Sequence, residues 1–252
     1  MNKPIDFRRF SCRQCLEEAD IGFDFTMAFQ PLVRYSNRSV IGYEALVRGL
    51  ENESAWSILQ QVNASNRYRF DQLCRIKAIE LAARLKLSGT LSINFLPNAV
   101  YRPELCIRTT FEAAELFGFP VENILFEFTE NEELISASHV KTVVESYQKM
   151  GFQTAIDDFG AGYSGLKLLA DFQTDIVKFD MALVRNIDRD VARQKIIRHC
   201  VSLCVDLGTT PLAEGIETQA EAEMLASLGV DLMQGYLFAR PGFEHLPSCS
   251  FE

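Results

Sequence analysis

The sequence has little of what marks a membrane-bound, secreted or duplex-binding chain. No apolar stretch approaches the roughly 20 residues needed to cross a bilayer, and the opening Met1–Arg9 has no signal-peptide-like hydrophobic run. Lys and Arg number 25 against 34 Asp and Glu, a net charge of −9, and no basic run is present. These absences predict a cytoplasmic chain without a membrane segment and without a duplex nucleic-acid partner.

Zinc ligands are also scarce. The seven cysteines are scattered and odd in number, and the three histidines lie far along the chain from Cys12 and Cys15. That pair has the spacing of half a zinc site, but no second Cys or His pair follows nearby. We predict an inert pair near a helix start and free thiols by default, with structural zinc or redox chemistry at Cys12 and Cys15 as the alternative.

Linkers and low-complexity segments are missing as well, which favours a single domain. With 48% hydrophobic and 23% charged residues, the 252-residue chain has the composition of a folded protein. We expect residues 1–24 to form a short N-terminal leader and residues 25–252 to form the domain. Its length is close to the roughly 250 residues typical of a (β/α)8 barrel.

Strand-like and helix-like segments alternate along this domain. Runs rich in apolar and β-branched residues predict strands at 26–33, 40–47, 90–95, 124–129, 153–157, 175–179, 210–213 and 231–236. Amphipathic patterns predict helices near 71–86, 136–150, 190–207 and 218–228. In the third helix, an apolar stripe is expected to face the sheet: Val191, Ile196, Ile197, Cys200, Val201, Cys204 and Leu207.

The connection between the first two strands is too short for a parallel crossover. Only Arg34–Ser39 join them, whereas a parallel crossover takes a dozen or more residues. The two strands should therefore form an antiparallel hairpin. The expected fold is an α/β, (β/α)8 TIM-like barrel that is not all parallel.

Acidic residues fall within or at the C-terminal ends of these strands. They are Glu44, Glu127, Asp157, Asp158 and Glu214. An acid at one strand end often caps the following helix or is solvated. Since parallel barrel strands end at one face, however, all five should converge on a common mouth, where carboxylates without cations repel one another. The set favours bound metal.

The ligand types indicate a hard cation. Carboxylates, joined by the amide oxygen of Asn94 at the matching position of another strand, favour Mg²⁺ or Mn²⁺ over zinc. Lys178 ends a strand with inward parity, and together with Arg48 and the metals it would attract an anionic substrate. A two-metal carboxylate cluster with a lysine suits in-line phosphoester hydrolysis. Ca²⁺ is expected to bind and inhibit, because its coordination is longer and more variable.

Eight ordered motifs between residues 25 and 241 resemble those of the EAL-domain cyclic di-GMP phosphodiesterases. They are Phe29-Gln30-Pro31-Leu32, Glu44-Ala45-Leu46-Val47-Arg48, Ile93-Asn94, Glu127-Phe128-Thr129-Glu130, Asp157-Asp158-Phe159-Gly160-Ala161-Gly162-Tyr163-Ser164, Lys178-Phe179-Asp180, Ala213-Glu214-Gly215-Ile216-Glu217-Thr218 and Gln234-Gly235-Tyr236. The resemblance implies hydrolysis of cyclic di-GMP to linear 5′-pGpG, which lowers the level of this bacterial second messenger. It also implies a barrel whose first strand is antiparallel, in agreement with the hairpin.

The resemblance further implies a role for each site residue. The implied metal ligands are Glu44, Asn94, Glu127 and Asp157, with Asp158 reaching a second ion. Glu214 is similar to the general base and Lys178 to the residue that orients the water. The implied substrate contacts are Gln30, Arg48 and Gln234, while Glu217 would support the metal site and Glu130 would anchor the loop Asp158–Ser164.

Assembly and two competing functions complete the expectations. EAL relatives commonly pair beside the loop Asp158–Ser164, and the apolar segment Gly165–Ala170 that follows predicts a homodimer. Its leucines could instead face the barrel. The first competing function is a catalytically silent EAL-like module that binds cyclic di-GMP or a protein partner. That reading predicts the loss of one or more of the acids, and none is lost. An unrelated barrel lyase would leave the co-occurring motifs unexplained.

Overall fold

The strands stand close to where the apolar runs predict them. The computed structural model describes residues 21–96, 106–129, 137–162 and 165–251. Its strands are β1 (Thr26–Arg34), β2 (Ser39–Arg48), β3 (Thr90–Asn94), β4 (Ile124–Thr129), β5 (Gln153–Phe159), β6 (Ile176–Phe179), β7 (Thr210–Ala213), β8 (Leu232–Met233) and β9 (Gly242–Phe243). β8 is shorter than expected, and β9 is an addition.

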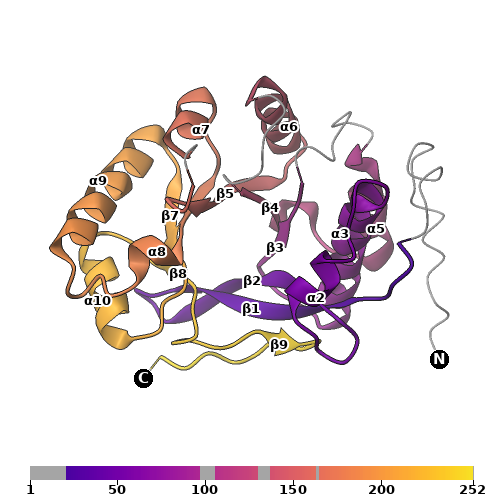
Figure 1. Ribbon diagram of the computed structural model, residues 1–252, viewed down its shortest axis with the longest axis horizontal. Helices are drawn as coiled ribbons and strands as arrows, with labels where there is room; N and C mark the ends of the chain where they lie inside the picture. The colour runs from indigo at the N-terminus through magenta and orange to yellow at the C-terminus, as the bar shows by residue number, and fades with distance from the viewer. Residues whose placement is uncertain (1–20, 97–105, 130–136, 163–164, 252) are drawn as a thin grey trace.

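β1 closes the barrel by pairing antiparallel with both of its neighbours. It pairs with β2, where Gln30 lies opposite Glu44, and with β8, where Val33 lies opposite Met233. From β2 to β8, consecutive strands are parallel neighbours. β9 pairs with β1 beyond this closure and runs beside it in Figure 1. The predicted TIM-like barrel with an antiparallel first strand is confirmed.

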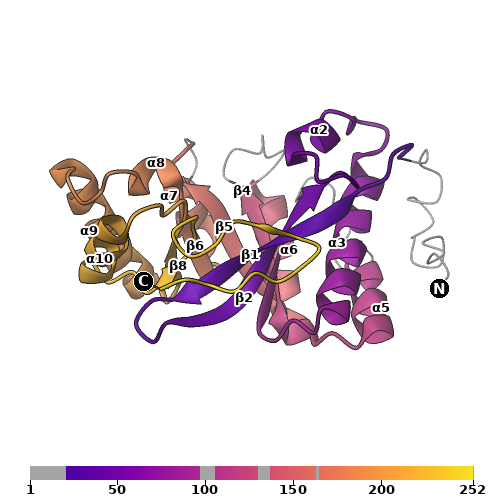
Figure 2. The same ribbon diagram turned by 90° about the horizontal axis from the view of Figure 1, so that it is seen from below.

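Helices surround the barrel on the outside (Figures 1 and 2). The four that the sequence predicts are α3 (Arg67–Arg84), α6 (Ala137–Lys149), α9 (Val191–Leu207) and α10 (Gln219–Ser227). Further short elements are α2 (Ala55–Leu59), α5 (Arg108–Phe117), η3 (Val121–Asn123), α7 (Gly165–Asp171) and α8 (Met181–Val184).

The apolar stripe predicted for α9 is partly wrong. Ile197, Val201 and Cys204 are buried, but Val191 and Ile196 are 60% and 47% exposed. Successive helical residues are about 100° apart, so positions 197, 201 and 204 share one face while position 196 lies at its flank. The predicted stripe is wider than the face of α9 that is buried, so Val191 and Ile196 at its edges are exposed to solvent.

The inside of the barrel has an apolar layer and a polar layer. The apolar layer is the cluster Leu32, Leu125, Ala155, Ile176, Leu212 and Leu232. Each of these apolar residues is two residues away in the sequence from a polar residue of the predicted site. The polar residues are Gln30, Glu127, Asp157, Lys178, Glu214 and Gln234. Because side chains two apart on a strand share a face, the polar residues point inward above the apolar layer. This packing places the site at the carboxyl ends of the parallel strands.

Two of the sequence expectations concern thiols and membranes. Cys74, Cys106, Cys200, Cys204 and Cys249 are free, in agreement with the expectation of free thiols. Cys12, Cys15 and nearly all of the expected leader 1–24 lie outside the described residues. Within the described ranges, none of the helices combines the length and the apolar character that a bilayer crossing requires.

Candidate active site

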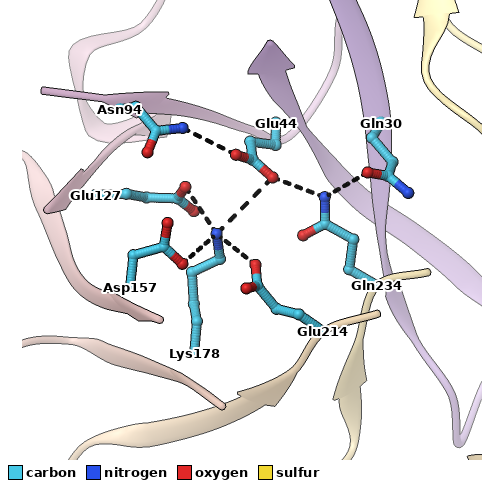
Figure 3. A network of polar contacts seen from close by, with 8 residues as sticks. All are labelled: Gln30, Glu44, Asn94, Glu127, Asp157, Lys178, Glu214 and Gln234. Atoms are coloured by element: carbon cyan, nitrogen blue, oxygen red, sulfur yellow. Dashed lines mark hydrogen bonds and ion pairs between the residues drawn. The ribbon is translucent and has the colours of Figure 1, made fainter. Parts of the chain in front are cut away.

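Lys178 lies at the centre of the polar layer, surrounded by carboxylates (Figure 3). Its Nζ lies 2.6 Å from Glu214 Oε1, 2.8 Å from Glu127 Oε2, 3.0 Å from Asp157 Oδ1 and 3.8 Å from Glu44 Oε2. Lys178 and Glu127 are both fully buried. The structure thus brings together acids from β2, β4, β5 and the end of β7 around one ammonium group from β6.

Glu44 is held in place by two side-chain amide groups, those of Asn94 and Gln234. Asn94 Nδ2 donates a 2.9 Å hydrogen bond to Glu44 Oε1, and Gln234 Nε2 donates one of 2.7 Å to Glu44 Oε2. Gln234 Nε2 also donates to Gln30 Oε1 at 3.2 Å, and Gln30 Nε2 donates to the carbonyl of Ala239. Both oxygens of Glu44 are therefore oriented by neutral donors.

An irregularity in β5 lets two consecutive acids face the same cavity. Neighbouring strand residues normally point to opposite faces. Here the pairing of β5 with β6 shifts register between Ile156 and Phe159, and Asp158 has a left-handed backbone with φ 55°. Such a shift is the local effect of a bulge, which re-aims a side chain. Asp157 and Asp158 consequently line one cavity together.

Burial and mutual repulsion raise the proton affinity of the cluster. Burial is the main cause that raises the pKa of Glu127 to about 8, with Lys178 opposing it and Glu44 adding to it. Burial, followed by repulsion from Asp157, raises the pKa of Asp158 to about 6. Burial also holds the pKa of the Glu214 carboxyl well above its ordinary value, against the attraction of Lys178.

Burial acts on the ammonium group of Lys178 in the opposite sense. Burial by itself would lower the pKa of Lys178, but the surrounding carboxylates, Asp157 above all, outweigh it and hold that pKa well above its ordinary value. Lys178 is therefore charged at neutral pH. One positive charge faces four acidic groups, so the cluster has room for further positive charge.

Divalent metal ions fit this set of side chains. Oxygen atoms of Asp157, Asp158 and Glu214 lie within 4.8 Å of one another. Among the described residues, Glu127 Oε1 is buried without a hydrogen-bond partner, which leaves it available to a cation. Carboxylate and amide oxygens are the ligands that Mg²⁺ and Mn²⁺ prefer. Glu214, predicted as a base, is close enough to Asp157 and Asp158 to share a metal with them.

The acidic cluster opens into a cavity of about 310 Å³. The predicted site residues that line it are Gln30, Glu44, Asp157, Asp158, Glu214, Glu217 and Gln234. Gly215 follows Glu214 with φ 68°, and a Cβ there would lie 2.4 Å from Met181 Cβ, so glycine lets the chain turn beside the acid. The backbone geometry thus supports the position of Glu214.

Other predicted residues lie at the edge of the site or outside the described chain. Arg48, at the end of β2, donates from Nη1 to the carbonyl of Val47 at 2.7 Å. Burial lowers the pKa of Arg48, and electrostatic interactions with Tyr236 and Glu44 oppose that effect. Glu217 lines the cavity and pairs with Arg185. Glu130 lies outside the described residues.

Sequence reasoning did not assign the cavity residues Tyr236, Arg185 and Asp180 a role. Tyr236 is 48% exposed, and the Arg240 guanidinium lies 4.3 Å from its ring centroid. Arg185 pairs with both oxygens of Glu217, with N···O distances of 2.7 and 2.8 Å. The motifs Lys178-Phe179-Asp180 and Gln234-Gly235-Tyr236 contain two of these residues, but Arg185 has no local signal.

Comparison with known proteins identifies the family. A closed barrel with an antiparallel first strand and an acidic cluster at its mouth defines the class, and the EAL domain profile matches residues 14–241. The chain belongs to the EAL domain family.

Solved structures of EAL proteins resemble it closely. A standalone versatile EAL protein from Vibrio cholerae O395, solved in a c-di-GMP bound form, is 61% identical with a TM-score of 0.90, over 92% of this chain and 98% of that one. The manganese/cy-diGMP complex of BlrP1 from Klebsiella pneumoniae at pH 9.0 is 36% identical with a TM-score of 0.85, over 90% of this chain and 58% of that one.

Curated relatives are more distant and longer. The blue light- and temperature-regulated antirepressor BluF of Escherichia coli K12 is 30% identical over 225 residues, which are 89% of this chain and 56% of BluF. The cyclic di-GMP phosphodiesterase RocR of Pseudomonas aeruginosa is 30% identical over 86% of this chain and 57% of RocR. The chain thus spans little more than half the length of these two relatives.

Proposed function

We propose that this chain is a metal-dependent phosphodiesterase that hydrolyses cyclic di-GMP to linear 5′-pGpG. The observation that carries the proposal is the complete acidic cluster around the buried Lys178. The name of RocR and the c-di-GMP bound form of the Vibrio cholerae EAL protein support this substrate class. A buried cluster of acids is costly to assemble unless cations complete it.

In this proposal Glu44, Asn94, Glu127 and Asp157 hold one divalent cation, and Asp158 reaches a second. The hydrogen bond from Asn94 Nδ2 to Glu44 leaves the side-chain oxygen of Asn94 on the Glu127 side (Figure 3). Bound Mg²⁺ or Mn²⁺ would supply the positive charge that draws in the phosphodiester and activates water. The BlrP1 complexes with manganese and with calcium support a divalent cation.

Glu214 is assigned the proton transfer. Its raised pKa gives this carboxylate a greater affinity for a proton than an ordinary glutamate has, as a general base requires. Lys178 Nζ, 2.6 Å from Glu214 Oε1, orients both that carboxylate and the attacking water. Gln30, Gln234 and Arg48 contact the substrate in this proposal, and Glu217 supports the metal site.

The test is incubation of the chain with cyclic di-GMP and Mn²⁺ or Mg²⁺, with chromatographic separation of the products. Formation of a linear dinucleotide, abolished by a chelator, supports the proposal. Tight binding of cyclic di-GMP without product would overturn catalysis in favour of the silent module. That alternative has its own support, because BluF is named as an antirepressor.

We also propose that the chain forms a homodimer. In α7, Leu168 and Leu169 are buried within the protein, so they face inward, whereas Leu166 is 66% exposed. The proposed contact therefore depends on Leu166 and not on all three leucines. Light scattering across a concentration series should show a dimer, and Leu166→Glu should convert it to a monomer. A monomer at every concentration in the parent protein would refute the dimer.

A further inference from the structure

A buried ion pair outside the cavity is joined directly to the end of β3. Arg75 Nη2 lies 2.6 Å from Asp71 Oδ2, both on α3, and both side chains are only 2% exposed. The other oxygen, Asp71 Oδ1, accepts a 3.0 Å hydrogen bond from the backbone N–H of Leu96. Leu96 is two residues beyond Asn94, the proposed metal ligand at the end of β3.

The chain around Asn94 is held from two sides. The N–H of Phe95 donates to the carbonyl of Glu127 at 2.9 Å, which continues the pairing of β3 with β4. The N–H of Leu96 donates in turn to Asp71 on α3. Asn94, the last residue of β3, directly precedes these two anchored residues, and its side-chain amide donates a hydrogen bond to Glu44. Asp71 is therefore connected to Glu44 by two hydrogen bonds, one to the Leu96 N–H and one from the Asn94 side chain, joined by the backbone from Leu96 to Asn94.

Stability alone does not account for this pair. Two buried charges lose most of their hydration, and well-packed apolar residues of similar volume are often as stabilising as a buried ion pair. Arg75 also donates from Nη1 to Thr110 at 3.4 Å and from Nε to the Asp71 carbonyl at 3.4 Å, and it interacts with the buried Tyr147. What the pair supplies, and apolar residues cannot, is a fixed, charged acceptor for the Leu96 N–H.

We propose that Asp71, oriented by Arg75, is a positioning residue for the metal site, which fixes the Leu96 backbone so that Asn94 and Glu44 are held in ligating geometry. This inference rests on the proposed function, because it takes Asn94 and Glu44 as metal ligands. Groups that orient metal ligands typically change metal affinity 10- to 100-fold when they are removed.

Two matched double variants isolate the acceptor. Asp71→Leu with Arg75→Met removes both charges and the acceptor, while Asp71→Asn with Arg75→Met removes both charges but keeps a side-chain oxygen for the Leu96 N–H. The measurement is Mn²⁺ binding to the full chain without cyclic di-GMP, by calorimetry or by the resonance signal of free Mn²⁺. The leucine variant should bind Mn²⁺ at least about tenfold more weakly than the parent, and the asparagine variant should recover most of that loss.

Asn94→Ala shows whether the effect passes through Asn94. In that background the substitution of Asp71 and Arg75 should change the Mn²⁺ dissociation constant by less than about twofold, because the residue being positioned is already gone. Thr110→Val is the control: it removes a partner of Arg75, keeps the bond to Leu96, and should leave Mn²⁺ affinity unchanged. Thermal unfolding of each variant separates loss of fold from loss of affinity.

Three outcomes would overturn the inference. They are parent-like Mn²⁺ affinity in the leucine variant, equal losses with and without Asn94, and no Mn²⁺ binding by the parent chain. Failure of the proposed function looks different, since the parent would then bind Mn²⁺ with the predicted dependence on Asp71 but leave cyclic di-GMP intact.

Discussion

Lys178 Nζ lies 2.6 Å from Glu214 Oε1, a contact between a side chain of β6 and the residue that directly follows β7. The same ammonium reaches Glu127 at 2.8 Å and Asp157 at 3.0 Å. Its positive charge is thus the main counter-charge of the cluster among the described residues. The charge balance of the barrel mouth therefore depends on this lysine.

Substitution of Lys178 by methionine should destabilise the metal-free protein. Removal of one partner from a buried ion pair typically costs about 3–5 kcal/mol, because the remaining charges are left uncompensated. Mn²⁺ should restore part of the lost unfolding free energy by binding the same carboxylates. Urea unfolding with and without Mn²⁺ measures both effects.

The matched control is Lys167→Met, which alters an exposed lysine on α7. This variant should unfold within about 0.5 kcal/mol of the parent. Equal stability of the Lys178 and Lys167 variants in the presence of a chelator would show that the ammonium group does not neutralise the cluster.

Glu214→Gln should lower kcat at least about a hundredfold, since it keeps the shape of the side chain and removes its basicity. Binding of cyclic di-GMP should persist, and exposed Glu223 on α10 offers a control as Glu223→Gln. Steady-state kinetics and substrate binding measured on the same preparations separate the two effects. Parallel losses of binding and turnover would assign Glu214 to holding the substrate or metal instead.

The stability of the metal-free protein should fall as pH rises from about 5 to 8. The folded-state pKa of Glu127 is raised from 4.5 to about 8 and that of Asp158 from 3.8 to about 6. Over this window the folded protein binds protons that the unfolded chain has released, so deprotonation favours unfolding. Mn²⁺ binding should tighten over the same window, because it requires the charged carboxylates.

Denaturant unfolding at pH 5, 6.5 and 8 in a chelator measures this slope. Glu127→Gln should flatten it, because glutamine does not titrate. A stability that rises steadily from pH 5 to 8 in the parent protein would show that Glu127 is ionised in the folded state.

Ca²⁺ should bind the site and support little or no hydrolysis. Its longer and more variable coordination spreads the geometry that Mg²⁺ and Mn²⁺ hold tightly. A titration of Ca²⁺ into a Mn²⁺-activated reaction should show competitive inhibition that excess Mn²⁺ relieves. Turnover with Ca²⁺ alone at a rate close to that with Mn²⁺ would argue against a two-metal in-line mechanism.

Much of the barrel is predictable because its strands are local apolar runs. The six residues Arg34–Ser39 are enough to predict the antiparallel pairing of β1 with β2, which the register confirms. Acids placed two residues after an apolar inward position, such as Glu127 after Leu125, also indicate the polar layer. The register shift at Asp157 and Asp158 is not predictable, because it depends on the pairing of β5 with β6.

Contacts made by tertiary packing have no local signal. Asp71 and Arg75 are four residues apart on α3, a spacing that usually indicates a solvent-exposed helix pair. Their burial follows only when Thr110 and Leu96 are brought against α3. Arg185 likewise has no local sequence signal, because its partner Glu217 comes from the segment that follows β7.

Hydrolysis of cyclic di-GMP at a metal held by Glu44 is measured as the initial rate of 5′-pGpG formation in Mn²⁺ for the parent, for Glu44→Ala and for the exposed control Glu51→Ala. Both oxygens of Glu44 are oriented within the cluster, so its removal deletes a proposed metal ligand with little expected change in the circular dichroism spectrum. We predict turnover in the parent and the Glu51 variant and a loss of at least about a hundredfold in the Glu44 variant. No product from the folded, Mn²⁺-loaded parent, or parent-like turnover by the Glu44 variant, would refute a phosphodiesterase whose metal ion is held by Glu44.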